Sequence, residues 1–422
     1  MQMLSLTGGA PLWGEVNISG AKNSVLPILA ALLCRGTCEL RNVPEIEDVS
    51  AACRILRSLG CRTVREHDRL LVDAAEVSGS TVNAELAGCM RSSVLFAGAL
   101  LARTGSAEVG LPGGCPLGLR PVDYHIRAFR ELGAEAEQRP DAVVCRRGGA
   151  SGGTVQLPFP SVGATENALL AAVGLGGHSE IRGAAREPEI TELAEFLISA
   201  GADISGVGTS CLCIEGGRPL HGVSCAIRPD RIETATYLCA CAACGGSICL
   251  TDAEEQTLLP VTDVLRQTGC SIRQMGRTLK ICAPQRLKAP EGIISTAPYP
   301  GFPTDAQALI MAALLRAEGS TVLEETIFEN RFRHVPQMRR LGAHITVSGC
   351  RAQVLGTPQL TGAFLEAEDL RGGASLVLAA LSAEGKSTIT GINHLRRGYD
   401  HLEEKLRSLG ADIKTLENAA AG

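Results

Sequence analysis

One cysteine, Cys115, is distinguished by its surroundings. It lies in LPGGCPLGLRPVD, residues 111–123, among glycines and prolines, and Arg120 follows five residues later. A buried structural cysteine normally sits in an apolar run, whereas this stretch can be neither a helix interior nor a strand. We therefore expect an exposed thiol. Neighbouring cations would lower its pKa from about 8.5, so that it could exchange a proton near neutral pH.

The other polar residues that could do chemistry recur at two equivalent places. One is the start of a buried helix, and the other is the loop after the strand that follows that helix. The helix starts carry Lys22 and Asn23, Arg91, Ser161, Asp230 and Arg231, Asp305, and Asp369 with Arg371. The loops carry Cys115 and Arg120, Arg186 and Glu187, Arg331, and Arg397. If the segments are related by symmetry, these residues converge on shared surfaces.

These residue types predict a site for a ligand with several negative charges. A helix start carries unpaired N–H groups and about half a positive charge. Arginine forks on phosphate or carboxylate oxygens add roughly 1.5–3 kcal/mol each. The cations that could share such a ligand are Lys22, Arg91, Arg120, Arg331, Arg371 and Arg397. Asp305 would be a carboxylate in a cationic site, where its ionised form is favoured and it could take a proton from a hydroxyl.

Several of these residues also have a structural interpretation. Aspartate at a helix start is often only a cap, which applies to Asp230 and to Asp369, although Asp369 stays a candidate binding residue. The charged residues of the run 186–189 are typical of a surface ion network. His125 is a candidate for a structural hydrogen bond or for catalysis.

A repeat along the chain indicates how these residues are positioned. A helix that ends in a hydrophobic turn followed by glycine occurs six times. The glycines are Gly60, Gly133, Gly201, Gly269, Gly342 and Gly410, at intervals of 73, 68, 68, 73 and 68 residues. Periodicity gives each copy the order βαβαββ. In the first copy we assign EVNIS to a strand, SVLPILAALLC to a buried helix, CELRNV to a strand, EDVSAACRILRSLG to an amphipathic helix, and RTVREH with RLLVDA to a hairpin.

The last copy lacks its second hairpin strand, because ADIKTL is followed only by ENAAAG. The N-terminal MLSLTG resembles the missing strand, so we expect it to complete the sixth copy and to place both termini in one discontinuous domain. A copy of about 70 residues buries too little surface to be stable alone, so the copies must pack together. Periodicity leaves open whether they form one ring of six or two sets of three.

Composition limits the function classes. The 422 residues are 45% hydrophobic with a net charge of −5, which gives no indication of nucleic-acid binding, and an anionic ligand would need a local group of cations. The N-terminus shows no signal-peptide pattern, and the uncharged run 234–251 is broken by Gly245 and Gly246, which argues against a membrane span. We expect a cytoplasmic protein.

Seventeen cysteines should stay reduced in that compartment. Cys241 and Cys244 form a CxxC pair, but no second pair or histidine pair follows at zinc spacing. We therefore expect no metal site and assign most cysteines to the core.

The motifs, taken together, resemble those of the enolpyruvyl transferase family, and within it the UDP-N-acetylglucosamine 1-carboxyvinyltransferases. They are SGAKN at 19–23, the Cys115 loop, PSVGAT at 160–165, AAREPEI, PDRIET, FPTDAQ, FENRF, DLRGGASLVLA and RRGY, in order from about residue 4 to about residue 414. The resemblance implies an inside-out α/β barrel fold of two domains with three repeats each and a site in the cleft between them. The domains would be 21–228, and 1–20 with 229–422.

The resemblance also implies a reaction and residue roles. The enolpyruvyl group of phosphoenolpyruvate would join the 3-hydroxyl of UDP-N-acetylglucosamine, phosphate would leave, and no metal or organic cofactor would take part. Cys115 matches a general acid that can bond to phosphoenolpyruvate and is alkylated by fosfomycin, and Asp305 matches the base. Lys22, Arg120 and Arg397 match the phosphoenolpyruvate contacts, supported by Arg331 and Arg371. The sugar-nucleotide contacts would be Asn23, Arg91, Arg120, Pro121, Val122, Asp123, Tyr124, Ser161, Val162, Gly163, Asp305 and Ile327.

The sequence departs from the family pattern at two places. Pro158, Phe159 and Pro160 stand where some relatives have a charged pair, and Gly372 with Gly373 follows Arg371 in place of Ala-Ser. Two alternatives stay open. One is the enolpyruvyl transferase that acts on shikimate 3-phosphate, which lacks the cysteine loop. The other is a non-catalytic homologue that binds sugar nucleotide.

Overall fold

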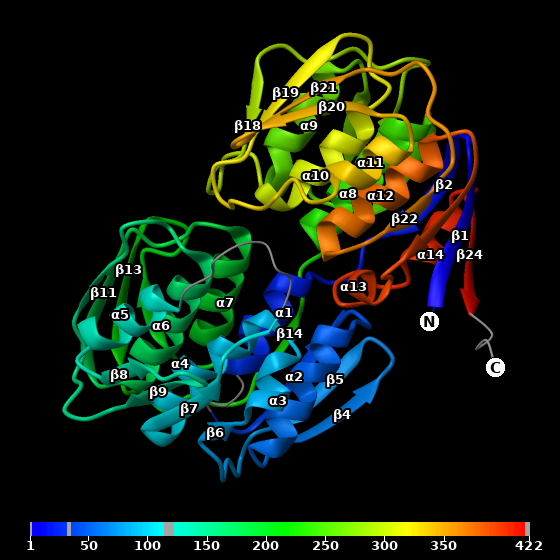
Figure 1. The fold of residues 1–422 in the computed structure, drawn as a ribbon. Helices are drawn as coiled ribbons and strands as arrows, with labels where there is room; N and C mark the ends of the chain where they lie inside the picture. Colours follow the sequence, from blue (N-terminus) through cyan, green and yellow to red (C-terminus); the bar gives the residue numbers. More distant parts are fainter. Residues whose placement is uncertain (1, 32–34, 114–121, 418–422) are drawn as a thin grey trace. The chain divides into compact units, whose positions relative to one another are not determined.

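The computed structural model describes residues 2–31, 35–113 and 122–417 (Figure 1). They divide into two compact units, called here the 20–228 unit and the 229–417 unit. The first contains the described residues of the ranges 20–113 and 122–228, and the second contains residues 2–19 and 229–417. We propose that these are the two domains expected from the sequence. Within the described ranges, no helix combines the length and the apolar character needed to cross a membrane. Cys115, Arg120 and Pro121 lie outside the described residues.

The predicted six-fold βαβαββ repeat is confirmed by six four-stranded sheets with one strand order. In each sheet the first strand pairs parallel with the second, and the second pairs antiparallel with the fourth, which pairs with the third. Each unit contains three such sheets, as the resemblance implied.

The 20–228 unit contains the first three sheets. Their strands, in spatial order, are β14 (Ser224–Ala226), β3 (Thr37–Arg41), β5 (Arg69–Asp73) and β4 (Arg62–Glu66); β6 (Thr81–Val82), β7 (Ser106–Gly110), β9 (Ala142–Arg146) and β8 (Glu135–Gln138); and β10 (Thr154–Gln156), β11 (Gly177–Arg182), β13 (Cys211–Gly216) and β12 (Asp203–Ser205). The helices are α1 (Lys22–Ala31), α2 (Glu47–Ser58), α3 (Ala84–Gly88), η1 (Arg91–Val94), α4 (Leu95–Thr104), α5 (Asp123–Glu131), α6 (Val162–Gly174) and α7 (Pro188–Ser199).

The 229–417 unit contains the other three sheets. Their strands are β2 (Leu12–Asn17), β15 (Gly246–Thr251), β17 (Thr278–Cys282) and β16 (Ser271–Met275); β18 (Ile293–Ser295), β19 (Ser320–Glu324), β21 (Arg351–Leu355) and β20 (His344–Ser348); and β22 (Phe364–Glu366), β23 (Gly385–Thr390), β1 (Gln2–Gly8) and β24 (Asp412–Glu417). The helices are α8 (Arg231–Cys244), η2 (Glu255–Leu258), α9 (Leu259–Gln267), α10 (Thr304–Leu314), α11 (Val335–Arg340), α12 (Leu370–Ser382), α13 (Asn393–Arg396) and α14 (Leu402–Ser408).

The first helix of each repeat lies at the centre of its unit. In α8 every residue from Ile232 to Ala243 is buried, and α10 and α12 are buried over most of their lengths. These helices are apolar on all sides, which is typical of a helix enclosed by other elements. The three helices α8, α10 and α12 pack against one another, and the sheets lie outside them (Figure 1). Their starts are therefore held close together.

The N-terminal strand completes the sixth repeat, as predicted. β1 pairs with β23 on one side and with β24 on the other, with Leu4 opposite Ile389 and Leu6 opposite Ile413. Leu4 and Leu6 are fully buried. The first residues of the chain thus form an inner strand of the last sheet.

The assignment of EVNIS to the first repeat was wrong. β2 pairs parallel with β15, with Val16 opposite Leu250, so it belongs to the fourth repeat. The place of the first strand in the first sheet is taken by β14, which pairs parallel with β3. Alternating hydrophobicity defines a strand but not its partner, and here the partner comes from more than 200 residues away.

Candidate functional site

The residues predicted at helix starts do begin the first helices of the repeats. Lys22 is the first residue of α1, Arg91 begins the 3-10 turn η1 that leads into α4, and Ser161 caps α6. Asp305 lies in the first turn of α10. α8, α10 and α12 pack together in the 229–417 unit, and α4 packs against α1 and α6 in the 20–228 unit, so these residues begin helices that are neighbours within each unit.

In the 229–417 unit, Asp305 lies between two arginines. Its Oδ1 is 2.8 Å from Nη2 of Arg331, and its Oδ2 is 3.1 Å from Nη2 of Arg371. Both arginine side chains are only 4% exposed. Burial alone would raise the pKa of Asp305, but the positive charges of Arg371 and Arg331 outweigh it and hold the pKa well below its usual range. This is the direction expected for a carboxylate in a cationic site.

A buried glutamate, Glu325, shapes the loop that carries Ile327. Its Oε1 accepts hydrogen bonds from the backbone N–H groups of Ile327 (2.8 Å) and Phe328 (3.1 Å), and its Oε2 accepts one from the Thr304 hydroxyl (2.9 Å). The ring of Phe328 lies 5.6 Å from the guanidinium of Arg331. Glu325 was not singled out in the sequence, although a carboxylate directly after β19 was the available signal.

Asp369 and Asp230 cap the starts of α12 and α8, as the structural interpretation of these aspartates predicted. Oδ1 of Asp369 accepts the backbone N–H of Arg371 (3.0 Å) and of Gly372 (2.8 Å). Oδ1 of Asp230 accepts the N–H of Ile232 (2.7 Å) and of Glu233 (3.1 Å). A Cβ at Gly372 would lie 2.6 Å from Oδ2 of Asp369, which explains the glycine at this departure from the family pattern.

In the 20–228 unit, Lys22 lies in an acidic environment. Its Nζ is 2.9 Å from Oδ2 of the buried Asp48. Burial, reinforced by the charges of Glu189 and Glu187, raises the pKa of Glu166 well above its usual range, while Lys22 opposes this. Glu189 is buried, so its assignment to a surface ion network was wrong, because it lies on the buried side of α7.

His125 belongs to a buried hydrogen-bond network. Asn167 on α6 accepts the backbone N–H of Gly98 (2.9 Å), donates to the carbonyl of Val94 (2.9 Å), and lies 2.9 Å from Nδ1 of His125. Burial, followed by the charge of Arg91, lowers the pKa of His125 to about 4, so the ring is neutral. This favours the structural interpretation of His125.

The predicted nucleotide contacts Ser161, Val162 and Gly163 form the start of α6 beside His125. The Ser161 hydroxyl accepts the N–H of Ala164 at 3.4 Å, and a Cβ at Gly163 would lie 3.2 Å from Cε1 of His125. Glycine therefore lets this turn pack closely on the ring.

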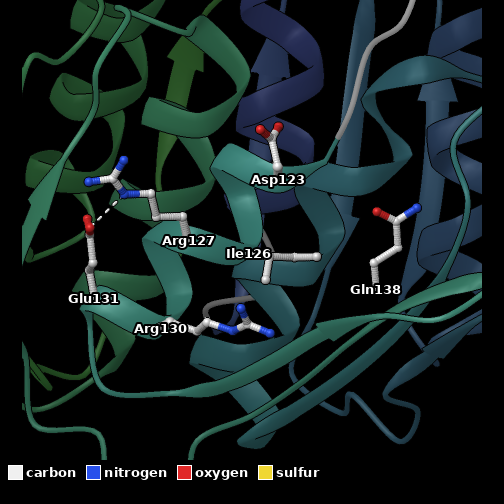
Figure 2. A pocket seen from close by; sticks show the side chains of 6 residues that line it. All are labelled: Asp123, Ile126, Arg127, Arg130, Glu131 and Gln138. Atoms are coloured by element: carbon white, nitrogen blue, oxygen red, sulfur yellow. Dashed lines mark hydrogen bonds and ion pairs between the residues drawn. The ribbon is translucent and has the colours of Figure 1, made fainter.

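Asp123 lines a cavity of about 460 Å³ along α5. Figure 2 shows its other lining residues, Ile126, Arg127, Arg130, Glu131 and Gln138. Nε of Arg127 is 2.7 Å from Oε1 of Glu131, and Nε of Arg130 donates to the carbonyl of Ala136 (2.8 Å). Asp123 is exposed, whereas its sequence neighbours are less accessible: Val122 is buried and Tyr124 is half-buried.

The CxxC cysteines lie at the C-terminal end of α8, where Cys241 is buried and Cys244 is half-buried. Burial raises the pKa values of Cys241 and Cys244 to about 12, so both thiols stay protonated. Within the described part of the chain, no three His, Cys, Asp or Glu side chains are placed to hold a metal ion.

Comparisons with known proteins agree over nearly the whole chain. The family model described as EPSP synthase (3-phosphoshikimate 1-carboxyvinyltransferase) matches residues 6–406. The UDP-N-acetylglucosamine 1-carboxyvinyltransferase of Dichelobacter nodosus is 45% identical over 421 residues, which cover 99% of this chain and 100% of that protein. The UDP-N-acetylglucosamine 1-carboxyvinyltransferase 2 of Caldanaerobacter subterraneus subsp. tengcongensis is 43% identical over 414 residues, which cover 98% of this chain and 99% of that protein.

Solved structures show the same likeness. The enolpyruvyl transferase NikO from Streptomyces tendae matches with a TM-score of 0.88 and 26% identity, over 98% of each chain. EPSP synthase from Acinetobacter baumannii matches with a TM-score of 0.75 and 19% identity, over 99% of this chain and 100% of that chain. At 19% identity, the match to EPSP synthase shows a shared fold and no more.

Proposed function

Because the chain belongs to the UDP-N-acetylglucosamine 1-carboxyvinyltransferase family, whose fold is that of the enolpyruvyl transferases, we propose that it is the enzyme that transfers the enolpyruvyl group of phosphoenolpyruvate to the 3-hydroxyl of UDP-N-acetylglucosamine. Phosphate is the second product. The transfer would be the first committed step of peptidoglycan synthesis.

The observation that carries this proposal is the carboxylate of Asp305, ionised and held by Arg331 and Arg371 at the start of α10. A sugar hydroxyl needs a base, and an ionised carboxylate in a fixed position can take its proton. The low pKa keeps Asp305 ionised but also makes it a weak base. The negative charges of phosphoenolpyruvate would compete for the two guanidinium groups and so raise the pKa of Asp305 when both substrates are bound.

The reaction can be balanced with the residues assigned to it. Asp305 takes the hydroxyl proton while the sugar oxygen bonds to C2 of phosphoenolpyruvate, and the Cys115 thiol gives a proton to C3. The tetrahedral intermediate then loses a C3 proton to the Cys115 thiolate, and phosphate leaves with the proton held by Asp305, so that the double bond and both side chains are restored. Lys22, Arg120 and Arg397 would hold the phosphate and carboxylate, with Arg331 and Arg371 supporting them.

The nucleotide contacts form a second group of assignments. Asn23, Arg91 and Ser161–Gly163 lie at the starts of the first helices of the 20–228 unit, where N–H groups favour anionic oxygens. Asp123 would approach the nucleotide from the start of α5. The remaining assigned contacts are Arg120, Pro121, Val122, Tyr124, Ile327 and Asp369.

Phosphate release tests the function directly. The protein is incubated with phosphoenolpyruvate and either UDP-N-acetylglucosamine or shikimate 3-phosphate, and free phosphate is measured. We expect sustained phosphate release only in the sample that contains UDP-N-acetylglucosamine together with phosphoenolpyruvate. Release with shikimate 3-phosphate would favour the other acceptor, and no release with either would favour a non-catalytic homologue.

A further inference from the structure

The aromatic side chain of Tyr399 connects several residues of the 229–417 unit. It lies two residues after Arg397, in the turn that follows α13, and is only 3% exposed. Its ring lies 5.4 Å from the guanidinium carbon of Arg371, and Arg371 in turn bonds to Asp305. Tyr399 therefore contacts a side chain of the Asp305 cluster.

The orientation of the Tyr399 ring is fixed by its hydroxyl. This hydroxyl lies 2.9 Å from Oγ1 of Thr236 on α8. The Thr236 hydroxyl donates its single proton to the carbonyl of Ile232 (2.8 Å), so Tyr399 must be the donor in the bond between the two side chains. Burial raises the pKa of Tyr399, which keeps that proton in place. The bond ties the ring to a buried helix.

The guanidinium of the buried Arg371 is incompletely hydrogen-bonded. Its Nη1 is buried and has no hydrogen-bond partner among the described residues, while Nη2 bonds to Asp305. An aromatic face attracts a guanidinium most strongly when both are desolvated, as they are here. A ring at this distance favours the guanidinium planes that keep Arg371 against the aromatic face.

The residue after Tyr399 strengthens the same anchor. Oδ2 of Asp400 accepts the Ser19 hydroxyl proton (2.7 Å), and Nζ of Lys405 donates to Ser19 Oγ (2.6 Å) and to Oε1 of the buried Glu233 (2.6 Å). Glu233 lies on α8, as Thr236 does. Two consecutive residues of the turn after Arg397 are therefore fixed, directly or through Ser19 and Lys405, to the same helix.

We propose that Tyr399 is a positioning residue for the carboxyvinyl transfer: its ring orients Arg371 against Asp305, and its bond to Thr236 fixes the turn that carries Arg397. The inference rests on the proposed function. It gives Tyr399 no contact with substrate, and its effect passes through the two arginines.

The test compares three variants by steady-state phosphate release from phosphoenolpyruvate and UDP-N-acetylglucosamine, by calorimetric Kd for UDP-N-acetylglucosamine, and by melting temperature. Tyr399→Met removes the ring but fills its space. We expect kcat to fall about 10- to 100-fold, because small displacements of positioned groups have effects of this size. The Kd should change less than about threefold. Tyr399→Phe keeps the ring but loses the bond to Thr236, so it should recover the part of the loss that comes from the ring and should lower kcat less than Tyr399→Met does.

Tyr237→Phe is the matched control. Tyr237 lies on α8 and is also a buried tyrosine, but its hydroxyl has no hydrogen-bond partner among the described residues. The kcat of Tyr237→Phe should stay within about twofold of the wild-type value. A fall in kcat of Tyr399→Met that is fully explained by a smaller fraction of folded protein would show that the role of Tyr399 is structural, and the inference would be wrong.

If Tyr399→Met does not fold, the double-mutant cycle of Tyr399→Leu, which also removes the ring, with Arg371→Lys replaces it. Lysine cannot stack as a planar fork, so a positioning role predicts effects on kcat that are not additive, and additive effects overturn it. Absence of phosphate release by the wild-type protein refutes the proposed function and this inference together. Full turnover by wild type and by both Tyr399 variants refutes the inference alone.

Discussion

Removing the carboxylate of Asp305 should cost the protein both stability and activity, in amounts that the structure allows us to work out. In Asp305→Ala, Arg331 and Arg371 lose their shared counter-charge while they stay 4% exposed. Removing one partner of a buried ion pair costs about 3–5 kcal/mol. Asp305 itself is 30% exposed, so we expect the lower end, about 3 kcal/mol. In a unit of about 200 residues, that corresponds to a Tm lower by about 6–12 °C.

The matched control is Asp252→Ala. Oδ1 of Asp252 is 2.8 Å from Nε of Arg277, the same separation as in the Asp305–Arg331 pair, but both side chains are largely exposed. An exposed pair contributes at most about 1 kcal/mol, so this Tm should fall by less than about 4 °C. Equal losses of Tm in the two variants would show that burial does not increase the contribution of the Asp305 ion pairs to stability.

Activity separates a base from a simple contact. Loss of a general base should lower kcat by about 10²- to 10⁴-fold. The calorimetric Kd for UDP-N-acetylglucosamine should change much less, because only one of many assigned contacts is lost. Equal fold losses in kcat and in affinity would reduce Asp305 to a binding residue.

Four further predictions follow from other parts of the molecule. Burial, only partly offset by Lys405, raises the pKa of Glu233 from 4.5 to about 7. Between these two pH values the folded protein binds more protons than the unfolded chain does. The contribution of Glu233 to stability therefore declines as the pH rises from 4.5 to about 7. The Tm of wild type should therefore fall more over this range than that of Glu233→Gln, and equal slopes would contradict the assignment. Asn167→Ala leaves Val94 at the end of η1 and Gly98 on α4 without these bonds and should lower the free energy of unfolding by about 1–3 kcal/mol in urea titrations; an unchanged midpoint would show that the network is dispensable. Deletion of residues 1–7 removes most of β1 and should lower the melting temperature of the 229–417 unit, and an unchanged value would contradict the pairing with β23 and β24. Cys115→Ser should largely abolish turnover and prevent alkylation by fosfomycin, measured by mass spectrometry of the intact protein, and retained alkylation would exclude Cys115 as the target.

The sequence predicted those features that depend on local patterns. The first helices and their starts were identified because apolar periodicity and polar residues at the start are both encoded within about 15 residues. The role of MLSLTG was predicted because the sixth copy lacked a strand that the other copies have. Both features follow from comparing the chain with itself.

Other features depend on contacts between distant segments. EVNIS was correctly identified as a strand, but its pairing with β15 is set by the tertiary fold. Glu189 looked like a surface residue because its neighbours in sequence are charged, whereas the packing of α7 buries it. Glu325 and Tyr399 act through bonds to residues far away in sequence, which no spacing rule reveals.

The central claim is that the chain adds a sugar hydroxyl across phosphoenolpyruvate and then eliminates phosphate. The most direct measurement is the deuterium content of the product formed in D₂O, followed by mass spectrometry and NMR. A proton delivered to C3 and then removed from the resulting methyl group predicts a UDP-N-acetylglucosamine enolpyruvyl ether with deuterium on its methylene carbon. Product without deuterium at that carbon, or no product at all, would contradict the account.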